Sequence, residues 1–124
     1  MEVYLYLPND NVDGFDAVLS TIKGFSAGAV VEALIDAGVF NEDVAVNSCR
    51  LNGEGSNATV VIDMNAAFGE AMKRTGTTGE YMMMGSLVNS LLEVFGASAA
   101  EVTVDGQILE TGHSIYDFPL RHMD

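Results

Sequence analysis

The strongest constraint on this fold is a long amphipathic pattern in the second half of the chain. Large apolar residues recur there every three or four positions, at Tyr81, Met84, Leu87, Val88, Leu91, Leu92 and Phe95. That spacing is typical of an α-helix with one buried face, and Glu80 and Glu93 fall largely on the other side. Thr77 and Glu80 have the spacing of a capping box, with Thr77 as the N-cap. Together with Gly96 as a stop, the pattern predicts a helix through residue 95.

Shorter patterns on both sides of this helix predict further strands and helices. Runs of β-branched, aromatic and apolar residues indicate strands at 3–7, 44–51, 58–64, 101–104 and 107–110. Helices are expected at 27–37 and 66–74, with Ser26 and Asn65 as their N-caps. Residues 15–25 alternate too weakly between apolar and polar to be assigned.

The order of these elements favours an α+β fold. It runs strand, helix, strand, strand, short helix, long helix, strand, strand, with helices expected on one face of a mixed β-sheet. Turn residues at 52–55 and the Asp105-Gly106 pair indicate two β-hairpins, the second with a type I′ turn. With 124 residues, of which 48% are hydrophobic, the chain can bury a core as one domain over 1–124.

The charge balance excludes some partners. Five basic residues against 18 acidic ones give a formal net charge of −13. Such a surface repels phosphate backbones and anionic lipid headgroups, so neither nucleic-acid binding nor peripheral membrane binding is expected. A basic protein surface or a cation would be attracted instead, although the charge could also serve solubility alone.

Cysteine and histidine are too scarce for several common sites. Cys49 is the single cysteine, so no intramolecular disulfide can form, and it is expected to be a buried, inert thiol in a strand. His113 and His122 are the only histidines, which excludes zinc sites of the cysteine–histidine kind. No metal or other cofactor is predicted. The chain has no apolar run long enough for a transmembrane helix, and its first residues do not form a signal peptide.

The loop after the first strand is a candidate cation site. Asn9, Asn11 and Asp13 alternate as oxygen ligands do at the start of a calcium loop, and Gly14 follows where that loop turns sharply. The match is partial, because Ser20 stands where a bidentate carboxylate is needed. The alternative interpretation is an Asx-rich turn with a purely local role.

His113 is the one candidate for acid–base chemistry. It precedes Tyr116 and Asp117, and a histidine near a carboxylate can act as a general base. Ser114 and Cys49 are available in principle as nucleophiles, but no nucleophile motif, phosphate loop, zinc motif or dinucleotide fingerprint accompanies them. We therefore expect no enzyme activity, and interpret His113 as a loop residue that hydrogen-bonds to backbone.

Several stretches together resemble the GerMN domain, which is named for a sporulation and spore-germination protein. They are the first strand VYLYLPND (3–10), the helix VEALI (31–35), the strand and turn ATVVIDMNAAF (58–68) and the helix end GSLVNSLLEVFG (85–96). VTVDGQ (102–107) follows at the expected distance, and the resemblance covers residues 3–121. The chain departs from the family in a short connection at 38–43 and in acidic rather than basic character before the last hairpin.

The resemblance implies a non-catalytic module of a bacterial cell-envelope protein, with sporulation or germination as its setting. It also implies a fold similar to ring-building motifs, an extracytoplasmic location, and no family catalytic residues to carry over. A protein partner or self-association is expected, through the strand edges at 3–7 and 101–110. The alternative function is an extracellular module that binds calcium or a small ligand through Asn9, Asn11 and Asp13.

Overall fold

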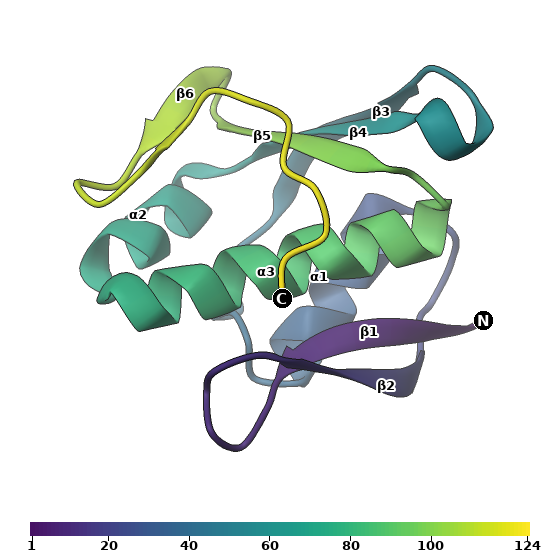
Figure 1. Cartoon of the computed structure of the whole chain (residues 1–124), viewed down its shortest axis with the longest axis horizontal. Helices are drawn as coiled ribbons and strands as arrows, with labels where there is room; N and C mark the ends of the chain where they lie inside the picture. Colours follow the sequence, from purple (N-terminus) through teal and green to yellow (C-terminus); the bar gives the residue numbers. More distant parts are fainter.

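The long helix forms where the sequence predicts it and lies across the middle of the molecule. In the computed structural model, which describes residues 1–124, helix α3 (Thr77–Phe95) packs between two β-sheets (Figure 1). Its apolar stripe, including Met84, Leu87 and Leu91, is buried. The opposite face is also covered, because Glu80, Ser86, Asn89 and Ser90 are buried too.

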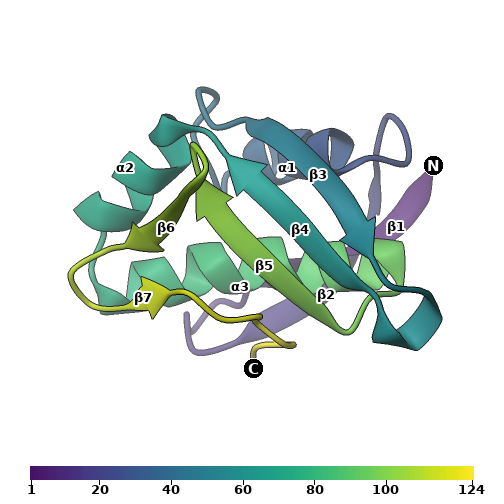
Figure 2. The same cartoon turned by 90° about the horizontal axis from the view of Figure 1, so that it is seen from above.

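A five-stranded mixed sheet covers one face of α3. Its order is β3-β4-β5-β6-β7, with β4 and β5 parallel and the other pairs antiparallel (Figure 2). The strands are β3 (Val46–Asn52), β4 (Thr59–Met64), β5 (Ala99–Val104), β6 (Gln107–Glu110) and β7 (Ile115–Tyr116). Helices α1 (Ala27–Asp36) and α2 (Ala66–Arg74) lie on the same side of this sheet as α3, and a short 3-10 turn, η1 (Gly55–Asn57), joins β3 to β4. The predicted α+β class, with helices on one face of a mixed sheet, is confirmed.

A separate hairpin covers the other face of α3. It consists of β1 (Glu2–Pro8) and β2 (Phe15–Thr21), so the unassigned residues 15–25 contain a second strand. The backbone N–H of Tyr6 donates to Ser90 Oγ at 2.9 Å, which ties β1 to the helix. The ring of Phe15 lies against Gly85, where a side chain would overlap it. Most of the polar face of the amphipathic pattern is therefore an interface, and Glu93 near the end of the helix stays exposed.

The alternation of β4 shows why this strand is central. Val60, Ile62 and Met64 point into the core and are fully buried, whereas Thr59, Val61 and Asp63 lie on the outer face. Those inward side chains meet Val30 and Leu34 of α1, Leu87 and Leu91 of α3, and Phe68 of α2 in one continuous core cluster. Removing such side chains from water is the main stabilising term of the fold.

Local capping and turn predictions are mostly confirmed. Ser26 accepts a hydrogen bond from the Ala29 N–H, and Asn65 accepts one from the Phe68 N–H. Both Asp105 and Gly106 have positive φ, at 48° and 77°, as a type I′ turn requires. The capping box at the start of α3 is wrong, because the N-cap residue is Gly76 and no side chain caps the helix.

The predicted burial of Cys49 is also wrong. Cys49 is exposed, although its register opposite Ile62 of β4 turns its side chain toward the helices. The reason is the position of β3 at the edge of the sheet, where the helices leave its inward face partly uncovered. No helix in this fold has the length and the apolar character that a bilayer-spanning segment needs.

Candidate functional site

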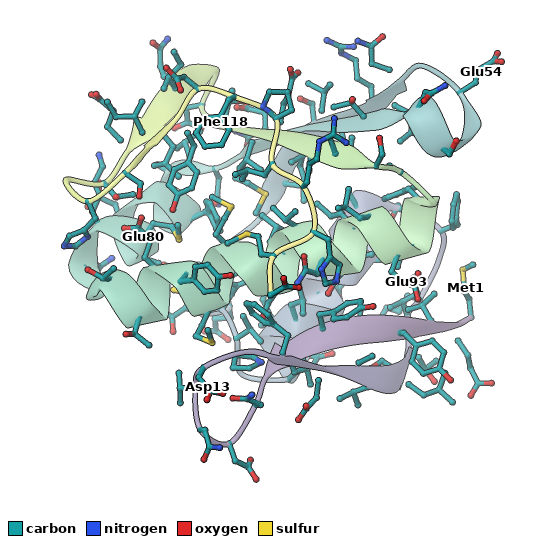
Figure 3. All side chains as sticks on the ribbon, viewed as in Figure 1. Met1, Asp13, Glu54, Glu80, Glu93 and Phe118 are labelled. Atoms are coloured by element: carbon teal, nitrogen blue, oxygen red, sulfur yellow. The ribbon has the colours of Figure 1, made fainter.

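The residues that the sequence singles out do not come together in one site. Asn9, Asn11 and Asp13 lie in the loop between β1 and β2, whereas His113 lies in the loop between β6 and β7. Figure 3 shows Asp13 in the loop of the first hairpin and Glu80 at the start of α3, on the side of the C-terminal strands.

The Asn9–Asp13 loop is closed by its own hydrogen bonds. Asn9 Nδ2 donates to Asp13 Oδ1 at 2.8 Å, and the Asp13 N–H donates back to Asn9 Oδ1 at 3.1 Å. The Val12 N–H bonds the Asn9 carbonyl at 3.0 Å. This is an Asx-type turn, in which two of the three proposed ligands already hold one another. Nowhere in the molecule do three or more histidine, cysteine or acidic side chains gather in a metal-binding arrangement.

A cluster around Glu80 connects the start of α3 to the C-terminal strands. The Tyr116 hydroxyl donates to Glu80 Oε2 at 2.7 Å, and His113 Nδ1 lies 3.3 Å from Glu80 Oε1. Glu80 is only 3% exposed. The structure thus brings His113 and Tyr116 together on the carboxylate of Glu80, which belongs to another element, whereas the carboxylate near His113 in the sequence is Asp117. His113 bonds this side chain rather than backbone alone, which corrects the interpretation from sequence.

The electrostatics of this cluster favour an ionised Glu80. Burial alone would raise the pKa of Glu80, but hydrogen bonds from Thr111, Tyr116 and His113 outweigh it, and the net shift is downward. Burial and the adjacent carboxylate raise the pKa of the Tyr116 hydroxyl, so it remains a proton donor to Glu80. We interpret the cluster as a structural lock, because both oxygens of the buried Glu80 carboxylate are engaged by His113 and Tyr116 and no nucleophile is hydrogen-bonded to the His113 ring.

The structural lock is one of several contacts through which the C-terminal residues cover the edge of β5. Thr103 and Val104 of β5 pair with β6, and at the other end of β5 Ala100 exchanges two backbone hydrogen bonds with Leu120 of the tail. The β6 strand in turn pairs with β7. The expectation that 101–110 offers an open edge is therefore wrong, because the chain's own C-terminal residues cover it.

The long unpaired edge of the main sheet is β3, whereas the opposite edge is the two-residue strand β7. Strand β3 pairs with β4 on one side only, and no backbone group of Val46–Asn52 bonds to any other part of the chain. Beside it runs an apolar groove of about 430 Å³, lined by residues of β3, the start of α1 and the end of α3. Phe25 and Leu51 in this groove are 60% and 47% exposed.

Sequence reasoning missed this edge for a physical reason. Leu51 and Cys49 follow the alternation of a half-buried strand, and nothing in that alternation says whether a helix covers them. Phe25 precedes the N-cap Ser26 and lies edge-on to Phe95, with ring centroids 5.0 Å apart. This contact joins residues far apart in sequence, so no local pattern could have indicated it.

The chain matches a known protein family over most of its length. The model of the Germane family, described as sporulation and spore germination, matches residues 4–110. A sequence search of curated proteins gives no match.

Three solved structures share the fold, each below 20% sequence identity. The first GerMN domain of the sporulation protein GerM from Bacillus subtilis is 16% identical, with a TM-score of 0.68 over 100% of this chain and 99% of that one. The tandem GerMN domains of the same protein are 17% identical, with a TM-score of 0.63 over 99% of this chain. A Clostridium perfringens protein, provisionally designated a lipoprotein, is 13% identical, with a TM-score of 0.62 over 98% of this chain and 85% of that one. This chain spans 45% of the tandem structure.

Proposed function

Because the chain belongs to the Germane family of sporulation and spore germination domains, we propose that it is a non-catalytic binding or assembly module of a bacterial cell-envelope protein. The proposal is supported chiefly by a contrast between two regions. The side chains around Glu80 are hydrogen-bonded to one another, whereas the apolar groove beside β3 is exposed. A groove of this kind beside an unpaired strand is a typical protein-interaction surface.

The absence of a paired nucleophile and base near His113 supports a non-catalytic role. His113 Nδ1 faces Glu80, and Cys49 lies in β3, at the opposite edge of the sheet from β7. A general base needs a reacting group within hydrogen-bond reach, and neither Ser114 nor Cys49 is hydrogen-bonded to the His113 ring, which bonds Glu80.

An extracytoplasmic location is part of the proposal. It is supported by the family description and by the fold shared with a protein provisionally designated a lipoprotein. The high negative charge fits a module that meets basic protein surfaces rather than anionic lipid.

Two measurements test this function. Sedimentation velocity over a hundredfold concentration range, at moderate salt to screen repulsion between copies, detects self-assembly. Proximity labelling from the parent protein in its own bacterium detects a different partner, with a cytoplasmic version of the same chain as the control. Discrete oligomers, or an envelope protein labelled only by the exported chain, would support the proposal. A monomer throughout, with identical labelling from both versions, would overturn it.

A further inference from the structure

The β3 edge offers main-chain hydrogen-bonding groups to a partner. In an antiparallel pair, alternate residues of an edge strand point their N–H and C=O groups away from their neighbour. A bulge between Val46 and Ser48 disrupts the start of β3, and Asn47 there uses its side chain to bond Asp63 and Asp105. The usable edge is therefore the regular stretch Ser48–Asn52.

The groove determines what the inward side chains of an added strand would meet. Cys49 and Leu51 pair with Ile62 and Val60 of β4, so their side chains lie on the helix side of the sheet. Side chains alternate across a strand, and every second residue of an added strand would enter the groove beside them. There it would contact Phe25 and Phe95 as well. Apolar residues at alternate positions fit this surface.

The charges around the edge determine what the ends of the added strand should carry. Arg50 is the only charged residue in β3, and none of the residues lining the groove is acidic. Glu42 and Asp43 precede the strand and Glu54 follows it, and all three are exposed. Basic residues at the ends of a bound segment would be attracted to these carboxylates and to the net charge of −13.

A second copy of this chain fits the edge poorly. Antiparallel pairing of two copies through their Ser48–Asn52 stretches, centred on that stretch, would place Arg50 of one copy opposite Arg50 of the other. Both copies would also carry −13. Like charges placed opposite each other across a pair of strands destabilise it.

We propose that Ser48–Asn52 of β3 binds an extended segment of a different protein, with apolar residues at alternate positions and lysine or arginine at both ends, by addition of that segment to the sheet. The inference rests on the proposed binding function and assigns it a surface and a class of partner. Main-chain bonds would contribute affinity, the apolar side chains in the groove would add to it and set the register, and the surrounding acidic residues would supply the preference for basic flanks.

The test uses a synthetic peptide with three valines at alternate central positions, serines between them and two lysines at each end. Amide NMR of the labelled chain should show shifts confined to β3, Phe25 and Phe95. Leu51→Ser should raise the Kd about tenfold, because the leucine side chain would be buried in the complex. Leu19→Ser is the matched control, since Leu19 is 55% exposed on β2, away from the groove, and it should leave the Kd unchanged.

Further peptides separate strand addition from simple charge attraction. A version with proline at two consecutive central positions loses a ladder hydrogen bond whichever of the two N–H groups faces β3, and a version with glutamates at its ends meets like charge. Both should bind at least about tenfold more weakly. Equal binding of all three peptides, shifts spread over the acidic surface, or equal effects of Leu51→Ser and Leu19→Ser would overturn the proposal. An envelope partner captured equally by the wild-type and Leu51→Ser chains would also overturn it, while leaving the binding function intact.

Discussion

In the five-stranded sheet, the edge of β5 is covered by further residues of the chain, whereas the edge of β3 is not. Beyond β5, the chain adds β6, β7 and the Leu120 bridge, and anchors them to α3 through the buried carboxylate of Glu80. Beyond β3 it adds nothing, and apolar side chains stay exposed next to unpaired backbone. A strand edge that is left uncovered can pair with another chain. A β3 edge that stays open while the β5 edge is covered is therefore the arrangement expected if β3 serves binding.

The comparison also separates two kinds of interaction. On the closed side, polar groups are hydrogen-bonded to other groups of the same chain, and Glu80 bonds both His113 and Tyr116. The open side depends on apolar area that has no intramolecular partner. Mutations on the closed side should therefore change folding stability, and mutations on the open side should change binding.

The largest effect is expected from Glu80→Ala. It leaves the Tyr116 hydroxyl without its acceptor and removes a buried ionic hydrogen bond, which should lower the free energy of unfolding by about 3 kcal/mol. Urea denaturation measures the change. Glu93→Ala is the control, because Glu93 is exposed on the same helix and its loss should cost less than about 0.5 kcal/mol. Equal costs for the two variants would contradict the lock.

A pair of leucines compares the two edges directly. Leu120→Ala should destabilise the chain by about 2 kcal/mol, because Leu120 is buried where the tail bridges β5. Leu51→Ala should change stability by less than about 0.5 kcal/mol, because nearly half of that side chain is already in water. Thermal unfolding of both variants checks this, and a larger loss for Leu51→Ala would reverse the assignment of open and closed edges.

The closed side should also respond to acid. The folded pKa of Glu80 lies below its usual value of about 4.3, so ionised Glu80 contributes stability above that pH. That contribution is lost as the pH falls through the folded pKa. Glu80→Gln should therefore flatten part of the decline in Tm below about pH 4 relative to wild type. Parallel curves for the two proteins would show that Glu80 is not linked to folding.

The smallest effect is expected from calcium. Asn9 and Asp13 already bond each other, so we expect millimolar calcium to leave the Tm unchanged. A ligand present at a hundred times its Kd would stabilise the folded state by about 2.7 kcal/mol, which thermal unfolding readily detects. A clear rise in Tm that is lost in Asp13→Asn would instead establish a calcium site in this loop.

The sequence predicted those features that depend on nearby residues. The period of α3, the caps at Ser26 and Asn65 and the turn at Asp105-Gly106 each need only a few neighbouring positions, and the structure confirms them. The α+β class followed from the order of such elements.

The missed features depend on residues distant in sequence. Glu80 looked like a solvent-facing residue because an amphipathic pattern cannot show that a second layer, here the β1–β2 hairpin and the C-terminal strands, covers the polar face of α3. Cys49 looked buried because alternation gives its side of the strand but not what packs on that side. The open groove was missed for both reasons: its residues come from distant parts of the chain, and the alternation of β3 does not show that its inward face is uncovered.

The reactivity of the Cys49 thiol tests the open edge most directly. The partly desolvated position of Cys49 in the groove raises the pKa of this thiol, so its reaction with a disulfide reagent should be slow at neutral pH and faster as the pH rises. We expect complete modification in the native chain without denaturant, and slower modification when the lysine-ended peptide occupies the groove. A thiol that reacts only after unfolding would show that the groove beside β3 is closed, and would contradict the account.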